Sequence, residues 1–290
     1  MLKYRVISGL VMTTVMALAF IYLPAIGVWL LLLLIAALGQ LEFYTLLNRG
    51  GIPVFRFVGL MSGLAMISAT FFSTSKDVGQ ATAPYMWENV VLLVTLGSVF
   101  LRQFPQKHNV KPLETMGCTL LGVLYVPYFL NYVTRLIFAW DGGSLLEPIS
   151  RTGRLLVFYF VVVTKSADIG AYFIGSRYGR HKLFPRISPA KSWEGLFGGI
   201  ASSMLASAIF FFCVQGQLGS VRLLPHDVLV LGGLLSVAGV VGDLFESLIK
   251  RSTGCKDSSA AIPGMGGLLD VLDSLLFGAP VMYLYALVFL

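Results

Sequence analysis

Two groups of carboxylates recur at helical spacing in the last third of the chain. Asp243 and Glu246 are followed by Lys250, and Asp270 is followed by Asp273. Residues three or four positions apart lie on one face of a helix. Mg²⁺ is typically bound by one or two carboxylates together with substrate phosphates, rather than by a complete protein cage. The spacing therefore fits two helices whose carboxylates hold Mg²⁺ beside a phosphate-bearing substrate.

A glycine-rich segment separates these two groups. Residues 264–267 include Gly266 and Gly267, and they follow Lys256 and Asp257. Glycine has little bulk to keep a phosphate chain away, and the start of the next helix favours anions. Glycine is also common between membrane helices for packing reasons alone. The charged residues on either side of this segment favour phosphate binding over a packing role alone.

Another candidate carboxylate, Asp168, lies three residues after Lys165 in an apolar segment. The two side chains share a helical face, so they can neutralise one another as a structural ion pair. A charge inside a membrane helix costs about 2.5–3.5 kcal/mol on insertion scales and is usually retained for a pathway, a partner or a site. Asp168 therefore has two interpretations, a structural ion pair or a carboxylate that faces a cation or a phosphate-binding pocket.

The segment 177–195 is dense in cations and in turn-forming residues. Ser188 followed by Pro189 is typical of a helix N-cap and first helical residue, which would direct backbone N–H groups at an anion beside Lys191. The alternative is a basic cytoplasmic loop that lies against anionic lipid headgroups. Both interpretations stay open at this point.

The elements that must carry these residues are membrane-spanning helices. The chain has 290 residues, of which 57% are hydrophobic and 12% are charged, against about 45–50% and about 25% in a soluble domain. A bilayer core about 30 Å thick needs roughly 20 apolar residues in a helix. We expect an all-α, polytopic integral membrane protein. The roughly nine expected spans are 4–23, 25–46, 55–74, 88–103, 113–139, 155–176, 194–214, 226–248 and 267–289.

The orientation follows from the basic residues, which membrane proteins concentrate in cytoplasmic loops. With the N-terminus inside, 15 of the 21 Lys and Arg residues fall on the cytoplasmic side and five on the other, with Lys165 inside a span. We therefore expect a cytoplasmic N-terminus and an external C-terminus. The same distribution explains the net charge of +7 without nucleic acid. We expect the first span to be an uncleaved helix, because a second apolar span follows directly after Pro24.

The chain is expected to divide into two regions. Residues 1–150 are interpreted as a scaffold of transmembrane helices, and residues 151–290 as a catalytic region with cytoplasmic loops. Six of the 14 acidic residues belong to the first region, mostly at span ends or in loops, where they do not indicate chemistry. Cys118, Cys213 and Cys255 are too far apart for a zinc or redox motif and are expected to be free thiols.

The later part of the chain resembles the phosphatidate cytidylyltransferase family. The family's closing signature is a serine, a Lys-Arg pair, a Lys-Asp pair after four more residues, a glycine-rich turn and two aspartates three apart. Residues 247–273 match this signature at the right spacing. The resemblance extends back through 242–247, 187–195 and 168–175 and covers roughly 165–275. In the first 150 residues, the fragment 42–44 is similar to a family fragment.

Two positions depart from the usual family pattern. Met265 stands where a histidine often lies between the glycines, and Val271 stands where an arginine often lies between the two aspartates. Both departures remove hydrogen-bond donors from the expected nucleotide pocket. Either other cations, such as Lys256 or Arg251, do that work, or the substrate preference is altered.

The resemblance implies an enzyme that transfers CMP from CTP to phosphatidic acid, giving CDP-diacylglycerol and pyrophosphate. The lipid phosphate is itself the nucleophile, so no covalent enzyme intermediate is required. Asp243 and Asp270 are implied as leading ligands of a shared Mg²⁺, in a site of one or two metal ions. Lys250 and Lys256 are implied as catalytic residues beside them.

Further site residues are implied in two groups. Additional metal ligands would be Asp168, Glu246 and Asp273. The substrate-binding residues implied are Ser188, Lys191, Arg251, Gly266 and Gly267.

Two competing functions are weighed against this one. A transporter would use Lys165, Asp168 and Asp243 along an ion path, yet the polar residues gather at one membrane face rather than at the midplane of two related halves. A transferase for another lipid phosphate would use a related site, while the signature of CDP-alcohol phosphotransferases is absent from the sequence. The expected partners are CTP, phosphatidic acid and membrane lipids, with a homodimer left open and no nucleic acid. The expected location is the inner cell membrane, with the site facing the cytoplasm.

The basic-residue distribution can be tested with Cys255. The orientation above places this thiol in the cytoplasm. In sealed, oriented vesicles, with Cys118 and Cys213 replaced by serine, an impermeant thiol reagent should label Cys255 only from the cytoplasmic face. Labelling only from the outside would contradict the orientation.

Overall fold

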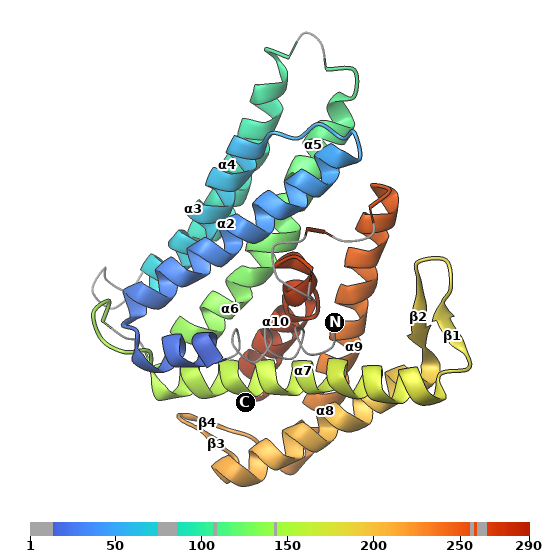
Figure 1. Cartoon of the computed structure of the whole chain (residues 1–290). Helices are drawn as coiled ribbons and strands as arrows, with labels where there is room; N and C mark the ends of the chain where they lie inside the picture. The colour runs from blue at the N-terminus through green and yellow to red at the C-terminus, as the bar shows by residue number, and fades with distance from the viewer. Residues whose placement is uncertain (1–13, 75–85, 107–108, 142–143, 256–257, 260–265) are drawn as a thin grey trace. The chain divides into compact units, whose positions relative to one another are not determined.

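The computed structural model describes residues 14–74, 86–106, 109–141, 144–255, 258–259 and 266–290, and these are mostly helical (Figure 1). Two short antiparallel sheets accompany the helices. The long elements in chain order are α2 (Ala25–Arg49), α3 (Arg56–Thr74), α4 (Met86–Gln103), α5 (Pro112–Val123), the π-helical turn η2 (Leu124–Tyr128), α6 (Phe129–Phe138), α7 (Arg151–Tyr178), α8 (Trp193–Val214), α9 (Pro225–Ser252) and α10 (Leu269–Phe289). The sheets pair β1 (Lys182–Phe184) with β2 (Ser188–Ser192) and β3 (Gln217–Leu218) with β4 (Val221–Arg222).

Seven helical segments within the described residues are long and apolar enough to cross a membrane. They are α2, α3, the continuous segment Pro112–Phe138, and α7 to α10. The chain is therefore a polytopic membrane protein. The span expected at 88–103 forms α4, but this helix of 18 residues carries Glu88 and Arg102 and is not among the seven. The first half of the expected span at 4–23 lies outside the described residues, and residues 14–22 of the second half are helical.

The all-α expectation needs one correction, because two short hairpins are present. Residues 182–192 fold back on themselves as β1 and β2, with Phe184 opposite Ser188. This segment is rich in turn-forming residues, which favour a reversal of the chain over a continued helix. The three cysteines are free, as predicted.

The chain forms two compact units, and the first contains residues 1–149 and 252–270. A buried polar contact joins three of its elements. The Tyr44 hydroxyl of α2 donates to the Thr119 carbonyl of α5 at 2.8 Å and accepts from the Gln40 amide at 3.0 Å. On α3, Gly59 leaves room for this ring, since an added Cβ would lie 2.0 Å from the hydroxyl. Small residues therefore let α2, α3 and α5 approach around one satisfied polar group.

A second polar contact in this unit neutralises a charge among apolar helices. Glu88 of α4 is 2% exposed and pairs with Arg135 of α6. The same carboxylate accepts a hydrogen bond of 2.5 Å from Thr70 of α3. The Arg135 guanidinium also lies over the Tyr132 ring. A buried carboxylate is tolerated when it is paired and hydrogen-bonded in this way.

The second unit contains residues 150–251 and 271–290. Its helices α7 and α8 lie side by side (Figure 1) and pack through small residues. A Cβ added to Gly170 of α7 would lie 2.0 Å from the Ser202 hydroxyl, and one added to Gly199 of α8 would lie 3.0 Å from the Ala167 carbonyl. Such small residues allow close backbone approach between membrane helices, where lipid supplies little hydrophobic drive.

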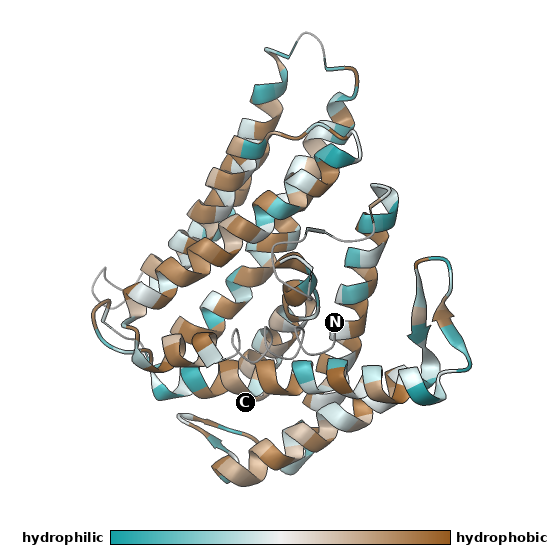
Figure 2. Ribbon diagram, in the orientation of Figure 1, coloured by the Kyte–Doolittle hydropathy of each residue, from teal (hydrophilic) through white to brown (hydrophobic). Residues whose placement is uncertain are grey.

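The hydropathy of the second unit is uneven along its elements. Figure 2 shows hydrophilic residues concentrated in the β1–β2 hairpin and toward the C-terminal end of α9, while the middles of the helices are mostly hydrophobic. At the other end of α9, Asp227 accepts hydrogen bonds from the Leu224 amide at 2.7 Å and the Tyr285 hydroxyl at 2.6 Å. Asp227 thereby joins the first turn of α9 to α10.

The close packing of α7 against α8 predicts a cost for any added side chain. Gly170→Ala should lower the stability of the protein by about 1–3 kcal/mol, because the new methyl group overlaps Ser202. Gly97→Ala is a matched control in the helix α4, since an added Cβ there meets nothing within 4 Å. The control should be neutral or slightly stabilising. Thermal unfolding in detergent would compare the midpoint temperatures of the two variants. Equal midpoints would contradict the close approach of α7 and α8 at Gly170.

Candidate active site

A cavity of about 470 Å³ lies within the second unit, where four elements present charged side chains to it. Asp168 comes from α7, Lys191 from β2 and Asp243 from α9. Lys182 of β1 adds a second cation to the wall. This volume lies within the range of small-molecule sites, which combine an enclosed space with a few convergent polar groups.

Glycines on three segments make the space for this cavity. Gly175 of α7 and Gly195 of α8 face one another, since a Cβ on Gly175 would lie 3.3 Å from the Gly195 Cα. Gly179, which ends α7, has no room for a side chain because its own Cβ would lie 2.3 Å from the Gly175 carbonyl. All three line the cavity. Small residues thus bring the hairpin and both helices together around a polar space.

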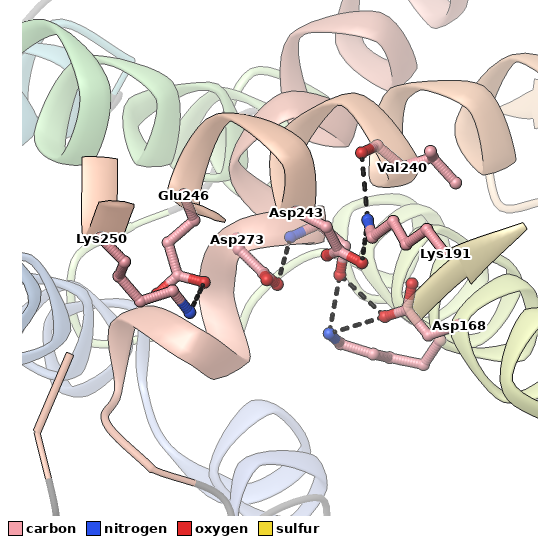
Figure 3. A network of polar contacts seen from close by, with 9 residues as sticks. Asp168, Lys191, Val240, Asp243, Glu246, Lys250 and Asp273 are labelled. Atoms are coloured by element: carbon pink, nitrogen blue, oxygen red, sulfur yellow. Dashed lines mark hydrogen bonds and ion pairs between the residues drawn. The ribbon is translucent and has the colours of Figure 1, made fainter. Parts of the chain in front are cut away.

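Lys191 connects the hairpin to α9. Its Nζ lies 2.7 Å from Asp243 Oδ2 and donates to the Val240 carbonyl at 3.3 Å (Figure 3). The two side chains of the ion pair are 21% and 30% exposed, so the pair remains accessible from the cavity. The sequence proposed Lys191 and Asp243 as site residues, and they lie on one wall of one cavity.

Lys165 and Asp168 form the ion pair that the sequence suggested, at 3.1 Å. Lys165 also donates to Ser274 Oγ at 2.8 Å and to the Val271 carbonyl at 2.9 Å, both on α10. The Ser274 hydroxyl in turn donates to Asp168 at 2.9 Å. The pair therefore ties α7 to α10, while Asp168 itself still lines the cavity.

Two further carboxylates lie beside this cluster. Glu246 is 2% exposed and pairs with Lys250 one turn later on α9, at 2.9 Å (Figure 3). Asp273 of α10 is 8% exposed and accepts from the Ser274 amide at 2.6 Å. Gly242 makes this arrangement possible, because a Cβ there would lie 2.2 Å from the Asp273 carbonyl oxygen. The missing side chain lets α9 approach α10 next to Asp243.

The charges of this cluster nearly balance. With every group ionised, four carboxylates face three lysines, which leaves one excess negative charge. Lys165 interacts electrostatically with three of the carboxylates. The four acids are Asp168, Asp243, Glu246 and Asp273, and the three bases are Lys165, Lys191 and Lys250.

A divalent cation fits this donor set when phosphates complete it. Across the described residues, no three His, Cys, Asp or Glu side chains converge on a common metal position. Instead, lysine ammonium groups lie against the carboxylates. Mg²⁺ needs only one or two carboxylates when substrate phosphates supply the remaining oxygens. The carboxylates of this cluster could therefore serve as ligands for Mg²⁺ only together with further oxygens, such as those of a phosphate.

Asp270 belongs to a separate group of contacts in the first unit. Its Oδ2 accepts from the Ser258 hydroxyl at 2.5 Å and from the Gly267 amide at 2.7 Å. The same Ser258 hydroxyl lies 2.8 Å from Glu42 Oε1, so its single proton is shared between the two carboxylates. The other oxygen of Glu42, Oε2, accepts from the Leu269 amide at 3.0 Å. Two carboxylates, one from α2 and one from the start of α10, thus contact the Ser258 hydroxyl and the backbone amides at the start of α10.

Gly266 and Gly267 have a steric role in this turn. Gly266 adopts φ +95°, a conformation that L side chains rarely adopt. A Cβ on Gly267 would lie 1.5 Å from Glu42 Oε1 and 2.2 Å from Ser258 Oγ. The approach of the two carboxylates therefore accounts for both glycines. Their contact with a phosphate chain stays a prediction.

Ser188 is a residue for which the sequence interpretation was wrong. It begins strand β2 and does not cap a helix. The N-cap of α8 is Ser192, whose hydroxyl accepts from the Gly195 amide at 3.1 Å. Ser188-Pro189 suits a helix start by composition, but pairing of β2 with β1 delays the helix by four residues. Ser192 also lines the cavity, whereas Ser188 is not among its lining residues.

The other residues that the sequence singled out are, where the structure describes them, not among those that line the cavity. Arg251 is exposed in the last turn of α9. Lys256 and Met265 lie outside the described residues. Val271, at the position where an arginine was expected, is 7% exposed and uses its carbonyl to accept from Lys165. An arginine at this position would therefore have to enter a packed environment.

Sequence reasoning missed Glu42, Ser258 and Ser274. Glu42 was assigned to the scaffold, although it is a carboxylate inside a long apolar helix, and such a charge is costly enough to indicate a role. Ser258 and Ser274 carry no comparable signal, because a serine near a helix end is common. Only their hydrogen bonds to Asp270 and Asp168 identify them.

Comparison with known proteins agrees with the motif pattern. Residues 3–289 match the profile described as "Cytidylyltransferase family". A phosphatidate cytidylyltransferase of Bacillus subtilis (strain 168) is 30% identical over 283 residues, which cover 97% of this chain and 96% of that protein. The phosphatidate cytidylyltransferase of Staphylococcus epidermidis is 32% identical over 276 residues, or 93% of this chain and 95% of that protein. That of Pseudomonas aeruginosa is 41% identical over 143 residues, about half of each chain.

The corrected helix cap makes a direct prediction. Ser192→Ala should lower the free energy of unfolding by about 0.5–2 kcal/mol, because the Gly195 amide loses its acceptor. Ser188→Ala is the matched control and should change stability by less than about 0.5 kcal/mol. Thermal unfolding of both purified variants would measure the difference. A larger loss for Ser188→Ala would restore the original assignment.

Proposed function

Because the chain belongs to the cytidylyltransferase family, we propose that it transfers CMP from CTP to phosphatidate, forming CDP-diacylglycerol and pyrophosphate. The observation that carries this proposal is the cavity in which Lys182 and Lys191 face Asp168 and Asp243. Cations for phosphates and carboxylates for a metal ion are the two kinds of group that a nucleotidyl transfer between two anions needs.

The proposed reaction is a single displacement at phosphorus. A phosphate oxygen of phosphatidate attacks the α-phosphorus of CTP, and the bond from that phosphorus to the bridging oxygen of the β-phosphate breaks. The electron pair leaves with pyrophosphate. The lipid phosphate is anionic before it reacts, so no enzyme group has to activate it by accepting a proton. Cys255 and the serines are therefore given no nucleophilic role.

Charge compensation is the task that we assign to the lysines. Lys191 forms an ion pair with Asp243 and is accessible from the cavity. We infer that Lys182 and Lys191 contact substrate phosphates, since an ammonium group is a mobile point charge suited to phosphate binding. Lys250, Arg251 and Lys256 remain proposed phosphate contacts. Ser188 is withdrawn as a helix cap.

Mg²⁺ is the proposed cofactor. Asp243 and Asp168 would hold it in the cavity, and Asp270, Glu246 and Asp273 remain proposed ligands or supports. When bound, Mg²⁺ would neutralise phosphate oxygens and orient the reacting groups. The lysines against Asp168 and Asp243 keep these carboxylates neutralised before substrate arrives. The pyrophosphate leaving group brings its own negative charge, which complements the same cations.

The proposed location is the inner cell membrane, with a cytoplasmic N-terminus and the site at the cytoplasmic face. The diacyl tails of phosphatidate stay in the bilayer, while CTP arrives from the aqueous side. In support, the β1–β2 hairpin and the C-terminal end of α9 carry the hydrophilic residues in Figure 2 and also the lysines Lys182, Lys191 and Lys250. Basic segments are typical of the cytoplasmic side.

The decisive assay uses purified protein, labelled CTP, Mg²⁺ and phosphatidate, with CDP-diacylglycerol and pyrophosphate as products. Wild-type protein should form both in equal amounts. Asp243→Asn should reduce turnover per folded molecule by at least about 100-fold, because it removes a carboxylate that would hold Mg²⁺ beside the transferring phosphates.

Asp227→Asn is the matched control for Asp243→Asn. It lies on the same helix, about 24 Å away along the axis, where it bonds Leu224 and Tyr285. This variant should lower stability while leaving turnover per folded molecule close to that of the wild type. Near-normal turnover in Asp243→Asn would remove this residue from the site. An absence of product with wild-type protein would refute the proposed reaction.

A further inference from the structure

Glu42 is the one acidic residue of helix α2, which belongs to the first unit. Helix α2 contains only two charged residues, and the other, Arg49, is in its last turn. A carboxylate within such a helix is expensive unless partners compensate it. Its partners lie more than 200 residues away in sequence, at separations of 216 for Ser258 and 227 for Leu269.

Both oxygens of Glu42 accept hydrogen bonds from residues near Asp270 in the first unit. Oε2 accepts from the Leu269 amide, which is at the first residue of α10, and Oε1 accepts from the Ser258 hydroxyl. Ser258 is 1% exposed, and its hydroxyl also lies 2.5 Å from Asp270 Oδ2. Glu42 therefore contacts the residue before Asp270 directly and Asp270 itself through one buried hydroxyl.

We propose that Glu42 is a positioning residue for Asp270. Together with Ser258, it holds the turn at Gly267 and the start of α10 so that the Asp270 carboxylate is presented in one orientation. This role rests on the proposed function, in which Asp270 is a metal ligand. Ligating carboxylates are commonly fixed by hydrogen bonds from groups that do not touch the metal, and losing such a group typically costs 10–100-fold in affinity or activity.

The attachment of α2 to its neighbours does not require Glu42. Gln40 and Tyr44 provide it, because Gln40 donates to the Gly59 carbonyl at 2.9 Å and Tyr44 donates to the Thr119 carbonyl at 2.8 Å. These contacts lie on other elements, α3 and α5. Glu42 is therefore not needed to attach α2 to α3 and α5. Its own hydrogen bonds go to Ser258 and to the Leu269 amide, both of which neighbour Asp270. This separation distinguishes positioning from general helix anchoring.

The steric fit of Gly267 supports the same role. An added Cβ at this residue would lie 1.5 Å from Glu42 Oε1. The Gly267 amide also donates to Asp270 Oδ2 at 2.7 Å. Gly267 therefore lies against the Glu42 carboxylate and also donates a hydrogen bond to Asp270. A substitution at Glu42 should for this reason alter the position of the Asp270 carboxylate.

The test is a double-mutant cycle of Glu42→Gln and Ser258→Ala in the full-length protein. Each single variant should lower kcat about 10- to 100-fold, because each loses a hydrogen bond to a charged group. The double variant should be little worse than either single one, because both act through the same turn. Glu114→Gln is the charge-matched control, since Glu114 pairs with Lys111 at an exposed position. It should leave kcat unchanged.

A second measurement does not depend on activity. Hydrogen exchange of the peptide 266–275, without substrate or metal, should be faster in Glu42→Gln than in the wild type and unchanged in Glu114→Gln. Unaltered exchange, or normal kcat per folded Glu42→Gln molecule, would overturn the positioning role. Losses that multiply in the double variant would also overturn it. A wild-type protein without CMP transfer would count against the proposed function, while the exchange measurement would still decide the role of Glu42.

Discussion

An ionised carboxylate among apolar helices has to be neutralised where it lies, because neither lipid nor packed side chains can solvate it. This requirement organises the second unit. Lys165 reaches from α7 to Ser274 on α10, Lys191 reaches from β2 to Asp243 on α9, and Glu246 is paired within its own helix. Each pair neutralises a carboxylate, and the contacts of Lys165 and Lys191 also join separate elements. The polar cavity lies beside these pairs, where Gly175, Gly179 and Gly195 leave space that larger side chains would fill.

Glycines have two distinct tasks in this protein. At Gly170 and Gly199 they let α7 and α8 approach closely, which is how membrane helices gain packing contacts. At Gly242 and Gly267 they admit polar groups, the Asp273 carbonyl and the Glu42 carboxylate. The same residue type thus brings helices together in one place and makes room for charged side chains in another. Composition alone does not separate these two tasks.

The arrangement is compatible with the site that we propose for anionic substrates. Four carboxylates without lysines would repel one another, and lysines without carboxylates would carry an uncompensated positive charge into the helices. Pairing removes both the repulsion between the carboxylates and the excess positive charge of the lysines. A divalent ion could replace the lysines as the partner of the carboxylates, and phosphates could replace the carboxylates as the partners of the lysines. A cluster that is nearly neutral is therefore compatible with a highly charged reaction.

The sequence by itself determined the class of protein and most of the candidate residues. Long apolar segments and the spacing of Asp243, Glu246 and Lys250 depend only on local periodicity, which a single chain records directly. The Lys165–Asp168 pair was predictable for the same reason. The helix boundary at Ser192 was not, because strand pairing between β1 and β2 competes with the helix signal at Ser188.

Only the tertiary structure decided which distant residues meet. Lys191 and Asp243 are 52 positions apart, and Glu42 and Ser258 are 216 positions apart. No local pattern encodes either contact, since each depends on how separate helices pack. Glu42 looked like part of a scaffold because its partners belong to the other end of the chain. The physical reason is that the role of a carboxylate such as Glu42 depends on the hydrogen-bond donors around it, and folding alone brings those donors together.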